Sequence, residues 1–381
     1  MSLKIAILGT RGIPNNYGGF EQIAGYLAKG LIDKGHSVTV YNSHNHPHKK
    51  NTWNGVNIIH CFDPEFLIGV AGQFIYDLNC ILNSRKKQFD IILMLGYTSS
   101  SVWGKLYPKN STVITNMDGL EWKRSKYSKP VRKFLLYAEK LAIRSGNFFI
   151  ADSIQIKKYL DEKYTINARY ISYGAEIIEK TNEDVFSEYD IVKHEYFLLV
   201  ARMEPENNIE LILDGFNNTY SPKKFIVIGN TKNRFGKYLV NKYKNDNRIE
   251  FTGALFNNEK LRALISFSYL YFHGHSVGGT NPSLVEAMAG KALIAAHDNL
   301  FNRSILDNDA FFFEDITTVQ NIICNTERGK IEETMIENNY AKIKSEFNWS
   351  SIVTQYEQFF YECYAAKNSA ATVFDGKLVS E

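Results

Sequence analysis

The chain has 381 residues, of which 44% are hydrophobic and 22% are charged, and its formal net charge is +3. This is the composition of a folded globular protein with room for two domains of about 150 to 200 residues each. The small net charge gives no reason to expect nucleic acid as a partner, so any basic surface would have to be local.

The first half of the sequence alternates strand and helix patterns, as a doubly wound parallel sheet does. An apolar strand at residues 4–8 leads into a glycine-bearing loop, and helical spacing follows over residues 20–31. Further strand patterns lie at residues 37–41, 56–61, 89–95, 111–115 and 147–151. Because Gly-x-Gly-x-x-Gly is absent and the second strand ends in Tyr41-Asn42 without an acidic residue, a dehydrogenase is disfavoured.

Polar loops follow two of these strands, where doubly wound folds bind ligands. Residues 96–101 are rich in hydroxyl groups, and residues 116–122 place two carboxylates just past a strand end. One of these carboxylates, Asp118, is either a site residue or a plain turn residue.

A strongly basic segment comes next, with one acidic residue, Glu139, and interleaved aromatic residues. Its basic residues are Lys123, Arg124, Lys126, Lys129, Arg132, Lys133, Lys140 and Arg144. Such a segment can lie on anionic lipid headgroups, or it can be the solvated face of a helix.

A polar stretch at residues 179–195 predicts a domain boundary near residues 175–190. A second sheet then begins with a strand at residues 196–201, which is followed by Arg202 and by an amphipathic helix at residues 209–216. Strand patterns followed by glycine recur at residues 225–228 and 249–254.

The most informative stretch is residues 273–290, where an aromatic strand breaks into glycines and then becomes a helix. Asn281 can cap this helix and Pro282 suits its first position, so the first-turn N–H groups lack intrahelical partners and attract anions, above all phosphate. Gly278 and Gly279 allow a ligand to approach the backbone closely. One turn into the helix, Glu286 can accept hydrogen bonds from the hydroxyl groups of a ribose or sugar.

The last part of the chain predicts two more strands and a long helix over residues 349–364. The chain's Asp-x-Asp, Asp307-Asn-Asp309, resembles a metal signature but is interpreted as a turn. The four cysteines are far apart, which fits reduced packing residues. Since no apolar run reaches about 18 residues, we expect a soluble protein or one bound to a membrane surface.

Three stretches carry a resemblance to a known family. Residues 8–21, 117–124 and 273–283 together resemble the family 4 glycosyltransferases, and within them bacterial rhamnosyltransferases of cell-surface polysaccharide assembly. The resemblance implies a GT-B fold, in which two Rossmann-like doubly wound domains face a cleft and a C-terminal helix crosses back to the first domain. The domains implied are residues 1–180 on the acceptor side and 181–348 for the nucleotide sugar, then a crossing helix at 349–366 and a tail at 367–381.

The resemblance also assigns roles to residues. Of the family's Glu-x7-Glu pair only the second, Glu286, is present, because Gly278 occupies the first position. Arg202 matches a diphosphate-binding arginine, whereas the family's lysine five residues later is Asn207; Arg11 or the basic loop at residues 232–237 are the candidate replacements. Asp118 would orient the transferred sugar or the acceptor. The donor-binding residues implied are Gly18, Gly19, Arg202, Gly278, Gly279, Thr280, Asn281, Pro282, Ser283, Leu284 and Glu286.

The activity implied is transfer of L-rhamnose from dTDP-rhamnose to a lipid-linked saccharide, with retention and without a metal or cofactor. The enzyme would be cytoplasmic or peripheral at the inner face of the cell membrane. Two alternatives stay open: a transferase that uses UDP-glucose, UDP-GlcNAc or GDP-mannose, and a catalytically silent sugar-nucleotide or glycan-binding protein.

Overall fold

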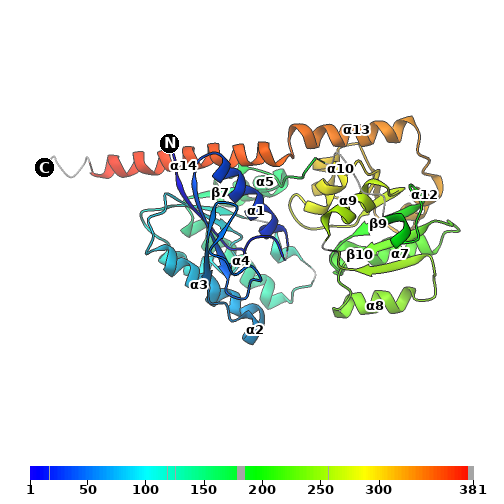
Figure 1. The fold of residues 1–381 in the computed structure, drawn as a ribbon, viewed down its shortest axis with the longest axis horizontal. Helices are drawn as coiled ribbons and strands as arrows, with labels where there is room; N and C mark the ends of the chain where they lie inside the picture. Colours follow the sequence, from blue (N-terminus) through cyan, green and yellow to red (C-terminus); the bar gives the residue numbers. More distant parts are fainter. Residues whose placement is uncertain (17, 118, 125, 178–184, 256, 376–381) are drawn as a thin grey trace. The chain divides into compact units, whose positions relative to one another are not determined.

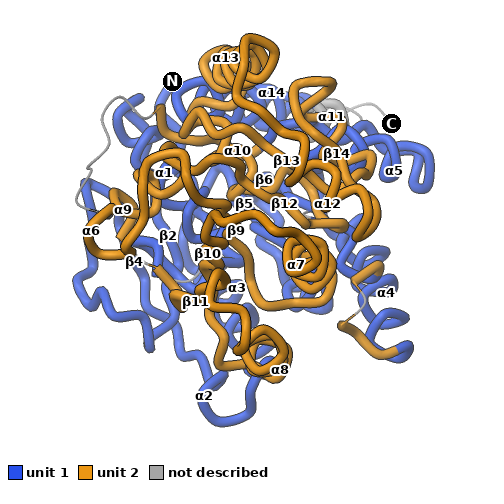
Figure 2. The backbone as a smooth tube through the Cα atoms, turned by 90° about the vertical axis from the view of Figure 1, so that its right-hand side faces the viewer, with its two compact units in different colours: residues 1–122, 129–172, 349–381 blue, residues 123–128, 173–348 orange. Residues whose placement is uncertain are grey.

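The computed structural model describes residues 1–16, 18–117, 119–124, 126–177, 185–255 and 257–375. It forms two compact units, each with its own sheet (Figure 1, Figure 2). Unit 1 contains Met1–Trp122, Lys129–Ser172 and Trp349–Glu381, and unit 2 contains Lys123–Ser128 and Tyr173–Asn348. The short segment 123–128 therefore belongs to unit 2, although it lies within the first half of the sequence.

Unit 1 is built on an eight-stranded sheet with the strand order β3-β4-β2-β1-β5-β6-β7-β8. Its strands are β1 Lys4–Leu8, β2 Ser37–Ser43, β3 Thr52–Trp53, β4 Val56–Cys61, β5 Ile91–Leu95, β6 Thr112–Asn116, β7 Phe148–Ala151 and β8 Arg169–Tyr170. Only the β3–β4 pair is antiparallel among the described strands of this sheet. At its centre β1 pairs with β5, where Ile5 lies opposite Ile91. Since helices cover both faces of a parallel sheet, such central strands are apolar runs without alternation.

The helices of unit 1 connect these strands. They are α1 Gly19–Asp33, α2 Glu65–Ile68, η1 Gly69–Ala71, α3 Gly72–Ser84, η2 Ser101–Leu106, η3 Glu121–Lys123, α4 Lys129–Ser145, α5 Ile154–Tyr164 and α14 Trp349–Asp375. Cys61, Cys80 and Cys363 are buried free thiols in this unit, as expected of packing residues, whereas the free thiol of Cys324 in unit 2 is exposed and does not fit that expectation.

Unit 2 is built on a six-stranded sheet with the order β11-β10-β9-β12-β13-β14, and its strand pairs are parallel. Its strands are β9 Tyr196–Val200, β10 Lys224–Ile228, β11 Ile249–Gly253, β12 Leu270–His273, β13 Ile294–His297 and β14 Phe311–Phe313. Its helices are α6 Val185–Glu188, η4 Pro205–Asn207, α7 Ile209–Asn217, α8 Arg234–Tyr243, α9 Asn258–Ser266, α10 Pro282–Ala289, α11 Leu300–Leu306, α12 Ile316–Asn325 and α13 Lys330–Ser345. The predicted α/β class with two Rossmann-like units is thus confirmed.

The C-terminal helix α14 packs against unit 1, as predicted. Trp349 stacks on Tyr26 of α1 with ring centroids 4.5 Å apart. At Gly30 of α1 an added Cβ would lie 2.7 Å from Val353, so glycine permits the close approach of the two helices. The helix continues to Asp375, past the predicted end at residue 366, because the alanine-rich sequence after residue 364 favours helix. Residues 376–381 of the predicted tail lie outside the described residues.

The packing of α14 generates a stability prediction. Phe360 of α14 is fully buried, so Phe360→Ala should lower the free energy of unfolding of unit 1 by about 3–5 kcal/mol. Urea unfolding followed by circular dichroism would measure it. The matched control is Phe66→Ala, since Phe66 is exposed and the same deletion there should change stability by roughly 0.5 kcal/mol or less. Equal effects of the two changes would mean that α14 is not part of the core.

Candidate functional site

The carboxyl ends of β9 and β12 lie side by side in unit 2, because the two strands pair in parallel with Leu199 opposite Phe272. The loops that follow them, residues 201–208 and 274–281, therefore begin at the same edge of the sheet. In doubly wound folds this edge is where ligands bind.

The two loops are bonded to each other. The N–H and the hydroxyl of Ser276 donate to the carbonyl of Glu206 at 3.1 and 2.8 Å, and the amide of Asn208 donates to the carbonyl of Gly274 at 2.8 Å. An added Cβ on Gly274 would lie 2.0 Å from the carbonyl oxygen of Asn207, so this contact requires glycine.

Helix α10 begins beside these loops. The Asn281 carboxamide oxygen accepts from the N–H of Ser283 at 3.0 Å and from its hydroxyl at 2.9 Å, which confirms the predicted cap. Pro282 follows as the first helical residue. Among the described residues, the N–H groups of Gly279 and Asn281 have no hydrogen-bond partner. This end of the helix can therefore bind an anion.

Three of the predicted donor-binding residues, Pro282, Ser283 and Leu284, have no backbone N–H available to a ligand. Pro282 has no N–H, and the N–H of Ser283 is occupied by Asn281, so neither donates a backbone hydrogen bond to a ligand. Leu284 is fully buried and its N–H bonds the Asn281 carbonyl at 3.0 Å. Leu284 thus anchors the helix to the core behind the site, because its apolar side chain is excluded from water.

Gly278 precedes the helix with φ +144°, a conformation that L side chains rarely adopt. Space is open around an added Cβ, so the backbone, not crowding, selects glycine here. A glutamate at this position would be strained. Two residues later in the chain, Thr280 is buried.

Arg202 lies at the end of β9 and is exposed. No ion-pair partner for its guanidinium occurs in the part of the chain that the structure describes. The nearby Asn207, which occupies the family's lysine position, is buried and donates to the Arg202 carbonyl at 2.7 Å. Asn207 therefore shapes the loop and supplies no charge.

A second arginine comes from the segment 123–128. The Arg124 guanidinium lies 3.9 Å from the carboxylate of Glu206, whose side chain is 3% exposed. Lys126 lies at the same distance from Glu204. The segment thus lies along the loop after β9, and the basic stretch predicted from sequence is divided between this loop and helix α4. Local pattern could not predict this division, because residues 123–128 belong to unit 2 although they lie between strands of unit 1 in the sequence.

The other two candidates for the missing positive charge are Arg11 and the basic loop at residues 232–237. Arg11 forms a two-point ion pair with Glu65 inside unit 1, at 3.0 and 2.8 Å, so it is already committed there. In the basic loop, Asn233 donates to the Met203 carbonyl at 2.7 Å, which places this loop next to Arg202.

Two histidines lie under the site. The rings of His273 and His275 stack with centroids 4.5 Å apart. Both nitrogens of His273 and Nδ1 of His275 are buried without a hydrogen-bond partner in the described chain. Burial lowers the pKa of His273 to about 3, and burial, His273, Arg202 and Arg124 hold the pKa of His275 well below its usual range. Both rings are therefore neutral. Sequence reasoning missed them, although His-Gly-His after a strand was a signal.

Glu286 is half-buried on α10, near the Tyr271 hydroxyl. Burial chiefly, and this carboxylate in addition, raise the pKa of Tyr271. The Tyr271 hydroxyl donates to the Ser283 carbonyl at 3.3 Å. Glu286 lies about 1.4 turns into the helix from the Asn281 cap, where it can reach a ligand's hydroxyl groups.

The remaining predicted site residues are in the first half of the chain. Gly18 is the extended N-cap residue of α1 and Gly19 its first residue. In the first turn of α1, Glu21 accepts from the Arg11 N–H at 2.8 Å and from the Thr10 hydroxyl at 3.0 Å. Asp118 lies outside the described residues.

The Asp-x-Asp stretch is structural. Asp307 ends α11 with φ 52°, and the carboxylates of Asp307 and Asp309 lie 2.9 and 3.0 Å from Lys342. Among the described residues no group of three or more His, Cys, Asp or Glu side chains is placed to hold a metal ion.

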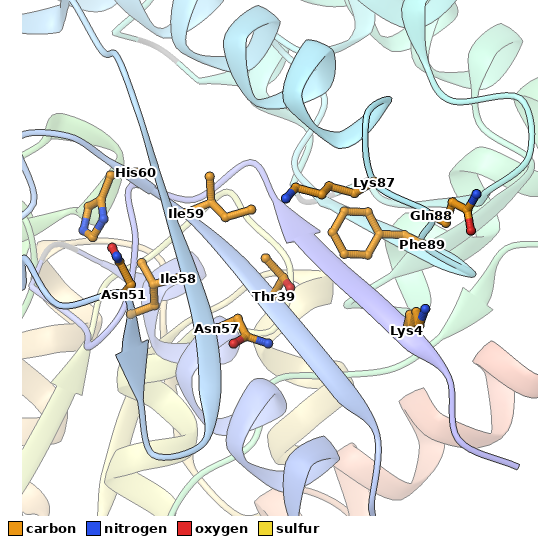
Figure 3. Close-up of a pocket in the computed structure, with 10 residues that line it drawn as sticks. All are labelled: Lys4, Thr39, Asn51, Asn57, Ile58, Ile59, His60, Lys87, Gln88 and Phe89. Carbon is orange, nitrogen blue, oxygen red and sulfur yellow. The ribbon is translucent and has the colours of Figure 1, made fainter.

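Unit 1 contains a separate hollow of about 660 Å³ (Figure 3). Lys4 and Phe89 line it, and they lie at the start of β1 and just before β5. This is the amino end of the strands, opposite the edge where such sheets bind ligands. We therefore assign it no function.

The buried histidines generate a pH prediction. Since the folded pKa of His273 is about 3 and the unfolded value is 6.5, the unfolded chain binds more protons between these values. The free energy of unfolding of unit 2 should fall as the pH is lowered through this window, by up to about 1.4 kcal/mol per pH unit from this residue. His273→Phe should flatten the decline in urea unfolding, whereas His48→Phe, in unit 1, should not. An unchanged slope in His273→Phe would contradict the burial argument.

Two family models match the chain. Residues 2–176 match a domain of unknown function, DUF1972, and residues 181–323 match the glycosyl transferases group 1 family. An uncharacterized glycosyltransferase of Methanocaldococcus jannaschii is 26% identical over 247 residues, which are 58% of this chain. The match spans 60% of that relative's length.

Solved structures show the same fold. Sucrose-phosphate synthase from Thermosynechococcus elongatus has a TM-score of 0.76 and 16% identity, covering 96% of this chain and 100% of that chain. HepE from Anabaena in complex with UDP-glucose has a TM-score of 0.77 and 16% identity, covering 94% and 100%. The chain therefore has the GT-B fold, its N-terminal half is similar to the DUF1972 domain, and residues 181–323 are similar to the group 1 glycosyl transferases.

Proposed function

We propose that this protein transfers L-rhamnose from dTDP-rhamnose, with retention, to a lipid-linked saccharide at the cytoplasmic face of the cell membrane. The observation that carries the proposal is the anion site at the start of α10, with its N–H groups at Gly279 and Asn281 and with Arg202 on the loop bonded beside it. A nucleotide diphosphate is the anion that a group 1 glycosyltransferase must hold.

The reaction breaks the bond between the sugar's anomeric carbon and the diphosphate. Negative charge then develops on the leaving diphosphate, and fixed N–H groups and arginines stabilise it without rearrangement. Arg202 supplies one positive charge, and Arg124, held near Glu206, supplies the second in place of the family's lysine. Glu286 accepts hydrogen bonds from the sugar of the nucleotide, and Asp118 orients the transferred sugar or the acceptor.

The choice of rhamnose rests on Gly278 and on the resemblance of three sequence stretches to rhamnosyltransferases. With glycine there, no side-chain carboxylate accepts hydrogen bonds from the hydroxyl groups of an ordinary hexose. Unpaired hydroxyl groups weaken binding, so the pocket disfavours glucose and suits a sugar with another hydroxyl pattern.

A second candidate is a transferase that uses UDP-glucose, because the structurally similar HepE was solved with UDP-glucose. UDP-GlcNAc and GDP-mannose are further donors of this kind. A catalytically silent nucleotide-sugar-binding protein is the third, since both the family's first glutamate and its lysine are replaced, by Gly278 and Asn207. Release of free dTDP from the donor in the presence of acceptor would exclude the silent protein.

Donor specificity is the first test. At about 100 times its dissociation constant, a donor stabilises the folded protein by roughly 2.7 kcal/mol. We expect dTDP-rhamnose to raise the melting temperature more than UDP-glucose or GDP-mannose at equal concentration. The shift should survive EDTA, because protein groups alone hold the diphosphate. Stabilisation by UDP-glucose but not by dTDP-rhamnose would reject rhamnose as the transferred sugar.

Substitutions separate the roles within the donor site. Arg202→Ala and Arg124→Ala should each weaken dTDP binding by about 1.5–3 kcal/mol, roughly 10- to 150-fold, and leave thymidine binding unchanged. Glu286→Ala should weaken both ligands, because it removes a contact to the nucleoside. Arg85→Ala, at an exposed arginine of unit 1, is the control. Calorimetric titration that finds the same dTDP affinity in Arg202→Ala and wild type would remove Arg202 from the site.

A further inference from the structure

An apolar ridge stands exposed on unit 1. Residues 66–71, Phe-Leu-Ile-Gly-Val-Ala, run along α2 and η1 and are all exposed. Phe66 is 62% exposed, Leu67 68% and Val70 70%. Single exposed apolar residues are ordinary, but a continuous run of large ones marks an interaction surface.

A basic face lies on helix α4. Its exposed residues Lys133, Tyr137, Lys140 and Arg144 are spaced by four, three and four positions, so they share one side of the helix. The acid within α4, Glu139, is buried and bonded to the Tyr159 hydroxyl at 2.8 Å and to Lys163 at 2.8 Å. The basic face therefore carries no acidic side chain of its own helix.

The ridge and the basic face belong to neighbouring elements. Phe74, two residues into α3, packs on Phe134 of α4 with ring centroids 5.8 Å apart. Trp103 of η2 donates to the Phe74 carbonyl at 2.9 Å. Since α3 follows directly after the ridge, these contacts connect the ridge to α4 through Phe74.

We propose that this combined surface docks the protein on an anionic lipid bilayer. Large apolar side chains enter the boundary between headgroups and acyl chains, while lysines and arginines beside them attract the negative headgroups. The chemistry selects lipid over a protein partner because the apolar residues project from short helical turns and the exposed face of α4 carries lysines and an arginine without an acidic side chain of its own helix.

Docking on a membrane surface is distinct from spanning the membrane. The stretch Glu65–Ser84 is long and apolar enough to cross a membrane by length and composition, with a mean hydropathy of 1.3, which by itself is weak evidence. Its second half is built into unit 1, because the Tyr76 hydroxyl donates to the carbonyls of Thr10 and Tyr41 at 3.0 and 2.9 Å. Cys80 and Ile81 belong to the same core. A span would have to remove these residues from the fold.

The docking rests on unit 1 alone, whereas delivery of a lipid-linked acceptor rests on the proposed function. Vesicle binding is measured without donor or acceptor. A failed transfer assay with intact vesicle binding would therefore count against the proposed function only, and failed vesicle binding with intact transfer would count against the docking only.

The test is sedimentation of the full chain with vesicles rich in phosphatidylglycerol, compared with phosphatidylcholine vesicles, at low salt. We expect binding to the anionic vesicles only, and release at high salt because salt screens the headgroups. Changing Lys133, Lys140 and Arg144 to Ser should weaken binding by roughly 100-fold, at about fivefold per charge. Changing Phe66, Leu67 and Val70 to Ser should weaken vesicle binding by at least tenfold. Each Å² of apolar surface that no longer enters the bilayer costs about 25 cal/mol of binding free energy.

Two matched sets serve as controls. Lys158, Lys244 and Lys330, and separately Val192, Leu300 and Ile331, are exposed residues outside the proposed surface, and their change to Ser should leave vesicle binding unaltered. The docking is overturned if wild-type protein ignores anionic vesicles at low salt, or if the control sets weaken binding as much as the surface sets. Binding that resists both high salt and alkaline carbonate would indicate insertion instead, and would also overturn it.

Discussion

The contact between the loops after β9 and β12 is the constraint on which the candidate site depends. At Gly274 the backbone passes so close to the Asn207 carbonyl that a Cβ would lie 2.0 Å from it. This approach lets Ser276 and Asn208 bond across the two loops. These bonds join the loop that carries Arg202 to the loop that leads into α10. The arginine and the N–H groups at the start of α10 are therefore in place before a ligand arrives.

The two departures from the family pattern, Asn207 and Gly278, lie in these two bonded loops. Asn207 lacks the charge of a lysine but ties its amide to the Arg202 carbonyl, and it is buried where a lysine would have to give up its hydration. In the proposed reaction the missing charge comes from a different segment, residues 123–128, whose Arg124 lies by Glu206. Gly278 departs for a backbone reason, its φ of +144°. The site therefore keeps an anion pocket while losing two family side chains.

The sequence was sufficient for features that depend on local pattern. The buried strands, the cap at Asn281 with Pro282, and the return of the last helix were predicted because apolar runs and capping residues act over a few positions. Features that depend on distant contacts were not predictable. Nothing in residues 123–128 indicates that they pack on unit 2, and residues 66–71 have the composition of a buried strand or helix, yet the fold leaves them exposed. The motif around Leu284 does not indicate which of its side chains face the ligand, and the Leu284 side chain faces the core.

The central claim is that the amide end of α10 holds the diphosphate of the donor. The most direct test follows the backbone amide signals of the protein by nuclear magnetic resonance as dTDP is added, with thymidine at equal concentration as the comparison. A phosphate group that accepts from the N–H groups of Gly279 and Asn281 should shift their signals strongly, and thymidine should not. If dTDP binds while these two signals stay in place, or if thymidine moves them as far, the diphosphate is held elsewhere and the account of the site is wrong.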